Sequence, residues 1–252
     1  MVEAPWDFSG KVVLVTGASV GIGAATAQMF AESGADLVIA ARQPERLEER
    51  ARSIAASTGR RCLAVPADVT EPAQVKAMVD RALEAFGRID ILINNAGNSV
   101  RSSLRKLTPE LWQWGRALNM DSAAYCTMEV GKHFLERKAG VIVNISSVAA
   151  QLGSANTYVD YAASKGAIDT FTTGLSNEVA GEGIRVVGIR PGLIDTEIHA
   201  SGGEPDRHHR LAKTVPMQRV GTADEIANAI VWLMSDEASY VTGTTIDVSG
   251  GR

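Results

Sequence analysis

A tyrosine and a lysine one helical turn apart are the residues of this sequence best suited to acid–base chemistry. Tyr161 and Lys165 stand in the run Tyr-Ala-Ala-Ser-Lys, and a spacing of four residues places both side chains on one helix face. A phenol ordinarily loses its proton near pH ~10, and a neighbouring ammonium lowers that pKa. The pair is therefore expected to exchange a proton with a substrate as an alcohol and a ketone interconvert. From these two residues alone, an unrelated surface pair at helical spacing remains the alternative.

The elements that must position this pair alternate along the whole chain. Short β-prone runs, several of them almost wholly apolar, are separated by helix-like segments. Apolar strands are typical of a parallel sheet covered on both faces, and the alternation predicts right-handed βαβ units. We therefore predict a single α/β domain over residues 1–252, a doubly wound (Rossmann) parallel sheet of about seven strands flanked by helices. The predicted strands are 12–16, 36–40, 61–66, 89–93, 141–146, 185–190 and 244–248. The predicted helices lie near 22–33, 44–58, 71–87, 108–137, 161–181 and 222–235.

The least regular segment runs from 192 to 217 and contains two glycines and two prolines. It follows a predicted strand end, where open α/β sheets place their ligands. Long irregular segments inside a domain are more often functional than accidental. We predict a lid over the substrate at 192–217, with the pair His208-His209 exposed to solvent.

A glycine-rich turn joins the first predicted strand to the first predicted helix. Gly17, Gly21 and Gly23 follow the spacing G-x-x-x-G-x-G. Such a turn lets backbone N–H groups approach phosphates at a positively polarised helix N-terminus. Since a strand precedes the turn and a helix follows it, the context predicts a dinucleotide-binding site; a tight turn without a ligand is the alternative.

The end of the second predicted strand favours NADP over NAD. Enzymes that use NAD commonly carry an acidic residue there, and this chain has Ala41 followed by Arg42. An arginine can pair with a 2′-phosphate through two hydrogen bonds. A solvated arginine before a charged helix is the alternative.

Composition excludes several other classes of function. The chain has 252 residues, 45% of them hydrophobic and 21% charged, with a formal net charge of −4. An acidic chain without a basic run is a poor candidate for nucleic-acid binding. Cys62, Cys126 and the four histidines show no metal-ligand spacing, so no metal site is expected. Residues 1–10 lack the pattern of a signal peptide and no run is long enough to span a membrane, which predicts a soluble cytoplasmic protein.

Taken together, these segments resemble the short-chain dehydrogenase/reductase family over nearly the whole chain. The landmarks are Thr16-Gly17…Gly21-Ile22-Gly23, Asp68-Val69, Asn94-Asn95-Ala96-Gly97, Asn119, Ser146-Ser147, Tyr161-x-x-x-Lys165, Pro191-Gly192 and Thr242-Gly243. Each motif alone is modest, but their order and separations are specific. Among family members, the pattern looks most like 3-oxoacyl-thioester reductases and glucose dehydrogenases.

The resemblance implies a role for each matching residue. Ser147, Tyr161 and Lys165 would form the catalytic centre, and Asn119 would hold a water that links Lys165 to solvent. Asp68 would contact the adenine, and Lys165 the nicotinamide ribose. The expected cofactor-binding residues are Gly17, Ser19, Val20, Gly21, Ile22, Gly23, Arg42, Asp68, Val69, Asn95, Ala96, Gly97, Tyr161, Lys165, Pro191, Gly192, Ile194 and Thr196. The expected substrate-binding residues are Ser147, Gln151, Tyr158, Leu193 and His199.

Several residues leave alternatives open. Ser146 and Ser147 are adjacent in a strand, so they face opposite sides and only one can reach the site. Tyr158 lacks the family spacing to Lys165, and we place it in the pocket wall. Two asparagines have structural alternatives. The alternative for Asn94 is that it only ties neighbouring strands together, and the alternative for Asn119 is that it only marks a helix kink.

The sequence thus predicts an NADP(H)-dependent oxidoreductase that transfers a hydride between nicotinamide and a ketone or secondary alcohol, a carbonyl reductase. The alternatives are an NAD(H)-dependent sugar or polyol dehydrogenase, a dehydratase on the same fold, and a non-catalytic dinucleotide-binding sensor. The resemblance further implies a homotetramer built on the helices near 108–137 and 161–181. No nucleic-acid or membrane partner is expected.

Overall fold

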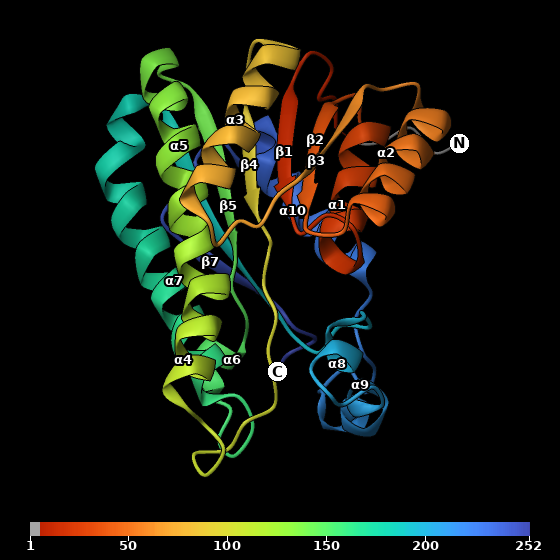
Figure 1. Ribbon diagram of the computed structural model, residues 1–252, viewed down its shortest axis with the longest axis vertical. Helices are drawn as coiled ribbons and strands as arrows, with labels where there is room; N and C mark the ends of the chain where they lie inside the picture. The colour runs from red at the N-terminus through yellow and green to blue at the C-terminus, as the bar shows by residue number, and fades with distance from the viewer. Residues whose placement is uncertain (1–5) are drawn as a thin grey trace.

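Seven parallel strands form one sheet in the order β3-β2-β1-β4-β5-β6-β7. The computed structural model describes residues 6–252 (Figure 1). The chain winds outward from β1 to one edge and then from β4 to the other, so the order reverses between β1 and β4. This confirms the doubly wound α/β fold. The strands are β1 (Val12–Thr16), β2 (Asp36–Ala41), β3 (Cys62–Pro66), β4 (Ile91–Asn94), β5 (Gly140–Ile145), β6 (Ile184–Pro191) and β7 (Thr245–Val248).

The helices that connect the strands begin and end at local signals in the sequence. Proline occupies the first turn of α2, α3 and α4, where its missing N–H costs no hydrogen bond. Gly59 and Gly87 end α2 and α3 in the left-handed conformation. Thr222 and Glu225 form a reciprocal capping box at the start of α10. The helices are α1 (Gly21–Glu32), α2 (Pro44–Thr58), α3 (Pro72–Phe86), α4 (Pro109–Arg116), α5 (Ser122–Arg137), α6 (Ala149–Leu152), α7 (Val159–Val179), α8 (Ile198–Ser201), α9 (Arg207–Leu211) and α10 (Ala223–Met234).

Alternate residues of the strands feed two separate hydrophobic cores. In β1, Val13 and Val15 pack with α1, α2 and α10, whereas Val12 and Leu14 pack with α3, α5 and α7. The strands are buried on both faces, which explains why they are apolar throughout rather than alternating. Figure 1 shows the two helical layers on either side of the sheet.

Two predicted elements differ from the structure. The single helix expected near 108–137 is interrupted by a π-helical turn, η1 (Ala117–Asp121), which separates α4 from α5. The segment 192–217 is not irregular throughout, because it contains α8, α9 and the 3-10 turn η3 (Ala212–Thr214). These helices span five residues or fewer, too short for a clear helical period in the sequence. In Figure 1, α8 and α9 lie beyond the carboxyl ends of the strands, across from α4 and α6.

None of the helices described by the structure is both long and apolar enough to cross a membrane. The prediction that residues 1–10 are not a signal peptide falls partly on residues 1–5, which lie outside the described part of the chain.

Candidate active site

A cleft of about 680 Å³ opens at the carboxyl ends of the strands, where the strand order reverses. This is where doubly wound sheets place their ligands. The cleft collects most of the predicted site residues from segments far apart in the sequence. Those that line it are Gly17, Ser19, Val20, Gly21, Ile22, Arg42, Asp68, Val69, Asn95, Ala96, Gly97, Ser147, Tyr158, Tyr161, Lys165, Pro191, Gly192, Leu193, Ile194, Thr196 and His199.

The glycine-rich turn needs glycine for steric reasons. Gly17 has a φ of 64°, and a Cβ there would come within 2.9 Å of the Asn95 Nδ2. A Cβ on Gly23 would collide with that same Asn95 amide and with the Gly17 carbonyl oxygen. Gly23 is therefore required for packing beneath the turn, and it does not line the cleft. That Gly23 also contacts the cofactor stays a prediction.

Asn95 fastens the turn to the neighbouring strand. Its Nδ2 donates to the carbonyl oxygens of Thr16 at 2.9 Å and Gly17 at 3.1 Å. The Thr16 hydroxyl in turn accepts the backbone N–H groups of Asn95 and Ala96 at 3.0 and 3.1 Å. These bonds hold the backbone of the turn in a fixed shape before any ligand arrives.

The N-terminus of α1 suits a pyrophosphate. Val20 precedes the helix and supplies no capping side chain, and no acidic residue occupies the first turn. The first N–H groups of a helix without a side-chain cap can bind anions, and the helix dipole favours a negative charge there. The turn and this helix end therefore fit the diphosphate of a dinucleotide.

At the end of β2 the cleft is lined by Arg42, which is exposed. Asp68 follows β3, and its Oδ1 accepts from the Thr70 backbone N–H at 3.0 Å and from its hydroxyl at 2.8 Å. Buried Val69 lies beside it. This part of the cleft fits an adenosine, with a cation rather than a carboxylate where the ribose 2′ position would lie.

The adjacent serines have different surroundings. The Ser146 hydroxyl is buried and donates to the Lys165 carbonyl oxygen at 3.1 Å. The Ser147 hydroxyl accepts the Ala149 N–H at 3.1 Å and lies within hydrogen-bonding reach of the Tyr161 phenol. Ser147 is thus the serine whose hydroxyl lies beside Tyr161.

Lys165 lies beside Tyr161, but the net pKa of the phenol is not lowered as the sequence predicted. Its Nζ is 5.7 Å from the Tyr161 ring centre and donates to the Ile145 carbonyl oxygen at 2.7 Å. Burial lowers the pKa of Lys165 to about 8. Burial also raises the pKa of Tyr161, and the Ser147 hydroxyl opposes this rise. The prediction of a lowered tyrosine pKa is wrong, because desolvation outweighs the opposing Ser147 hydrogen bond and Arg207 charge.

Asn119 lies in the π-helical turn η1 and is 2% exposed. Its Nδ2 donates to the carbonyl oxygens of Asn98 at 2.8 Å and Gly115 at 2.9 Å. A Cβ on Gly97 would lie 2.9 Å from the Asn119 Oδ1 and 3.3 Å from the Lys165 Nζ. Asn119 does not line the cleft itself, but only the small Gly97 separates its Oδ1 from the amine.

Asn94 ties two strands together, which is one of the alternatives that the sequence left open. Its Nδ2 donates to the Asn144 Oδ1 at 2.9 Å, which joins β4 to β5. Asn94 is buried and does not line the cleft.

The loop after β6 forms another wall of the cleft. A Cβ on Gly192 would lie 2.6 Å from the Ser249 Cα, so the close approach of this loop to the chain after β7 needs glycine. Leu193 and Ile194 are buried, and the Thr196 side chain lies 3.4 Å from the position of a Cβ on Gly21. The loop after β6, which is predicted to bind the cofactor, therefore lies close to the glycine-rich turn.

Of the predicted substrate residues, Tyr158, Leu193 and His199 line the cleft and Gln151 does not. Gln151 is exposed, and its amide lies 3.5 Å from the Asp247 carboxylate. The single turn of α6 directs Ala149 and Leu152 into the cleft instead. Placing Gln151 in the pocket was wrong, because the sequence does not show which side of so short a helix faces inward.

The expectation of two solvated histidines holds only for His209. His208 is buried, its ring stacks on that of His199 with centres 5.0 Å apart, and its Nε2 lies 3.3 Å from the Asp195 Oδ1. His199 itself bonds the Ile194 carbonyl oxygen through Nε2 at 2.8 Å.

Four charged residues of the cleft were not predicted from the sequence. Arg46 pairs with Glu197 through two hydrogen bonds of 3.2 and 2.8 Å, joining α2 to the loop before α8. Arg207 and Arg252 line the opposite end. Nothing in their local sequence distinguishes them from solvated arginines. Within residues 6–252, no cluster of three or more His, Cys, Asp or Glu side chains could hold a metal ion.

Comparison with known proteins identifies the family. A family model described as "Enoyl-(Acyl carrier protein) reductase" matches residues 17–252. The uncharacterised oxidoreductase YgfF of Escherichia coli K12 is 44% identical, covering 96% of this chain and 99% of its own length. The 3beta-hydroxysteroid dehydrogenase 1 of Eggerthella lenta is 40% identical, covering 97% and 94%.

A crystal structure of a short-chain type dehydrogenase/reductase from Mycobacterium marinum superimposes with a TM-score of 0.93 at 31% identity, covering 97% of this chain and 96% of that one. The chain belongs to the short-chain dehydrogenase/reductase family, and it is an NAD(P)-dependent oxidoreductase.

Proposed function

We propose that this oxidoreductase uses NADP(H) and interconverts a ketone and a secondary alcohol through Ser147, Tyr161 and Lys165. One observation carries the proposal: these three side chains line one cleft together with the glycine-rich turn of β1–α1. A dinucleotide on that turn would extend along the cleft toward the three side chains. When bound, the nicotinamide supplies or accepts the hydride.

In the direction of reduction, the Ser147 hydroxyl donates a hydrogen bond to the carbonyl oxygen, on which negative charge develops. Tyr161 gives its proton to the same oxygen. A phenol with an ordinary pKa near ~10 is protonated at neutral pH, as a proton donor requires, and burial raises the Tyr161 pKa further.

Lys165 would bind the nicotinamide ribose and, as a cation, stabilise the tyrosinate formed at turnover. Its Nζ is already fixed by the Ile145 carbonyl oxygen. Asn119 is fixed by three backbone contacts, with Asn98 and Gly115, just beyond Gly97. Asn119 would hold a water through which Tyr161 and Lys165 regain a proton from solvent.

The preference for NADP rests on Arg42. The cleft presents this guanidinium after β2, where an enzyme that prefers NAD would carry an acid. We further propose that the whole chain works as one domain, with 192–217 as the lid, in the cytoplasm. The exposed Met128 and Leu135 on α5 and Val159 on α7 support a homotetramer built on these helices.

The mechanism is tested by following reduced nicotinamide at its absorbance band with a panel of ketones. We expect Tyr161→Phe to lower kcat by about 10³-fold while cofactor affinity stays near wild type. Tyr158→Phe is the matched control, because it removes a phenol from the same wall. Near-normal turnover in Tyr161→Phe would refute the acid–base role. Tight cofactor binding without turnover on any ketone would favour a sensor.

The cofactor preference is tested with Arg42→Ala. We expect KM for NADPH to rise by about 10- to 100-fold, since a charge-assisted hydrogen bond pair is lost, and KM for NADH to change little. Arg52→Ala is the control, because this exposed arginine of α2 does not line the cleft. Equal effects of Arg42→Ala on both cofactors would rule out a role in 2′-phosphate binding.

A further inference from the structure

Arg207 and Arg252 line the same cleft as Tyr161. Neither has a role in the proposed chemistry. Arg207 belongs to α9, and its side chain is 23% exposed, the most buried of the arginines around Glu204. Arg252 is half-buried, and both burial and the charge of Arg207 lower its pKa, which shows that the two cations share one region.

The side-chain carboxylates of the cleft do not bond these two cations, and the main-chain carboxylate of Arg252 accepts the Ser249 hydroxyl at 3.0 Å. Among the described residues, Asp68 and Glu197 are the acidic side chains that line it. Asp68 lies at the adenosine end, after β3. Glu197 uses both carboxylate oxygens to accept hydrogen bonds from Arg46.

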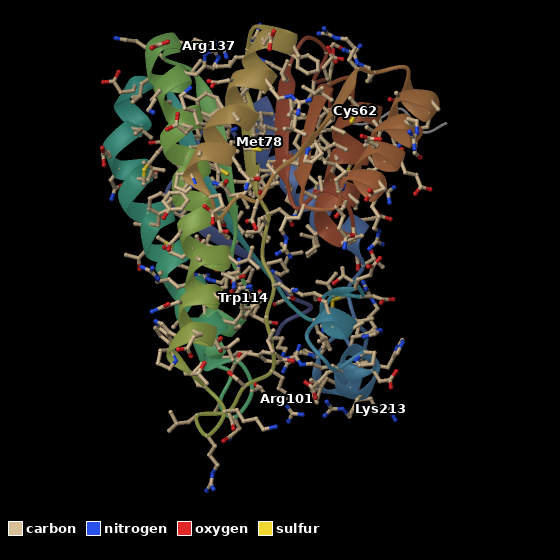
Figure 2. The ribbon with its side chains drawn as sticks, in the orientation of Figure 1. Cys62, Met78, Arg101, Trp114, Arg137 and Lys213 are labelled. Carbon is tan, nitrogen blue, oxygen red and sulfur yellow. The ribbon has the colours of Figure 1, made fainter. Side chains whose placement is uncertain are left out.

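The carboxylate nearest to Arg207 is shared among three arginines. Glu204 lies 3.8 Å from the Arg207 Nε, but its Oε1 accepts shorter bonds of 3.0 Å from Arg101 and from Arg210. Its Oε2 accepts the Tyr158 hydroxyl at 3.0 Å. One negative charge thus faces three positive charges. Figure 2 shows Arg101 at the end of the molecule that carries α9.

Arg207 is held in place without using its hydrogen-bonding capacity. Its Cζ lies 5.0 Å from the centre of the Tyr158 ring, a cation–π contact that orients the guanidinium. Over residues 6–252 the structure shows no hydrogen bond donated by the side chain of Arg207 or Arg252. A guanidinium offers five N–H donors arranged to match a carboxylate or a phosphate.

This charge lies close to the reacting groups. Arg207 is near enough to Tyr161 and His199 for its charge to lower both pKa values. His199 is further held neutral by burial, so it adds no opposing or competing charge at pH 7. A substrate whose carbonyl meets Tyr161 would therefore extend toward two cations that lack a hydrogen-bonding partner within the described chain.

We propose that the natural substrate is an acidic carbonyl compound, whose carboxylate or phosphate is bound by Arg207 and Arg252 while its carbonyl lies against Ser147 and Tyr161. The inference rests on the proposed function and specifies its substrate class. It assigns Arg207 and Arg252 as specificity-determining residues.

Matched substrate pairs test the proposal on the wild-type enzyme. The carboxylate pair is 4-oxopentanoate and its methyl ester, and the phosphate pair is dihydroxyacetone phosphate and dihydroxyacetone. We expect kcat/KM to be about 10- to 100-fold higher for the anionic member of at least one pair, because hydrogen bonds between charged groups are stronger than neutral ones. The pair that shows the larger ratio identifies the anion. Ratios near one in both pairs would overturn the proposal.

Substitutions then attribute the preference to named residues. Arg207→Gln and Arg252→Gln are each expected to remove most of the preference by raising KM for the anion, leaving KM for its neutral partner unchanged. Arg210→Gln is the matched control, since Arg210 is in the same helix and bonds the same carboxylate but does not line the cleft. Melting temperature and NADPH affinity verify that each variant is folded. An equal loss in Arg210→Gln, or a preference that survives both cleft substitutions, would overturn the assignment.

A binding measurement separates this inference from the proposed function. Calorimetric titration of the four compounds into protein saturated with oxidised NADP, which has no hydride to give a ketone, measures the anion preference without reduction. Selective anion binding without turnover on any ketone would refute the reductase mechanism and support the anion site. Turnover of neutral ketones without anion preference in either assay would support the reductase mechanism and refute the anion site.

Discussion

The two ends of the sheet differ in whether their buried charged side chains are paired with opposite charges. At the amino ends of the strands, the Asp90 carboxylate is 9% exposed and accepts hydrogen bonds from Arg88, Arg137 and the Val12 backbone N–H. Asp36 at the start of β2 is bound similarly by Arg60 and Arg61. In Figure 2, Arg137 lies at the opposite end of the molecule from Arg101 and Lys213.

At the carboxyl ends, the charges are not satisfied within the described chain. Lys165 is 3% exposed, and its amine bonds a backbone carbonyl rather than a carboxylate. Burial lowers its pKa to about 8, whereas at the other end the arginines hold the pKa of Asp90 below its ordinary value despite burial. Arg207 and Arg252 add further cations.

The difference separates charges that stabilise the fold from charges that await a ligand. A buried carboxylate with a full set of donors belongs to the stability of the sheet. A buried amine, and guanidinium groups that donate no hydrogen bond, reduce stability unless something anionic or polar binds them. Activity and stability should therefore respond to substitutions at different ends.

The largest effect is expected at Lys165. Lys165→Met should lower kcat/KM by about 10³-fold, because the ribose contact and the charge beside Tyr161 are both lost. The melting temperature should stay the same or rise, since an apolar side chain replaces a desolvated amine. Steady-state kinetics and thermal unfolding measure the two effects. A large fall in melting temperature would show that Lys165 stabilises the fold.

The same residue gives a pH dependence of defined sign. Between pH about 8 and pH ~10.4, the unfolded chain keeps a proton on Lys165 that the folded chain has released. The unfolded state then binds more protons, so the contribution of Lys165 to the free energy of unfolding rises with pH over this window. The free energy of unfolding, measured with denaturant at pH values from 7.5 to 10, should rise less steeply with pH for Lys165→Met than for wild type. Identical slopes would contradict a lowered lysine pKa.

The next effect is at Asp90, at the other end. Asp90→Asn should destabilise the protein by about 2–4 kcal/mol, because it leaves two arginines without their buried partner, while kcat/KM of the folded enzyme is unchanged. Since the pKa of Asp90 is lowered, its contribution is complete above the unfolded pKa of ~3.9 and is lost as pH falls through the folded pKa.

Asp80→Asn is the control for Asp90. Its ion pair with Lys76 is more than half exposed on both sides, so a much smaller loss of stability than in Asp90→Asn is expected. Urea unfolding compares the two variants. A loss of activity in fully folded Asp90→Asn would contradict the prediction that this end of the sheet affects stability and not catalysis.

The smallest effect is expected at the Arg46–Glu197 bridge across the cleft. The two side chains are 49% and 57% exposed, so Arg46→Ala should leave the melting temperature near that of wild type and change cofactor KM by less than about fivefold. Glu197→Gln should give the same small changes. Changes of 100-fold in KM would show instead that Arg46 binds the cofactor directly.

The strands and long helices could be predicted from local signals, because periodicity, prolines and glycines act over a few residues. The doubly wound fold followed from the alternation of strand and helix. The π-turn at 117–121 could not be predicted, since the pattern continues through it and the turn is held by Asn119 bonds to Asn98 and Gly115. The inward side of α6, and hence the position of Gln151, likewise depends on distant packing.

By itself, the sequence determined the sheet, the glycine-rich turn and the placing of Tyr161 and Lys165 on one helix face, because spacing along a helix or strand fixes direction. Only the tertiary structure decided the electrostatics. Desolvation and charge balance depend on which segments meet in space. The raised pKa of Tyr161 and the hydrogen bond from the Lys165 amine to Ile145 therefore arise only in the folded chain. The same holds for the burial of His208 and for the cations at 207 and 252 that line the cleft.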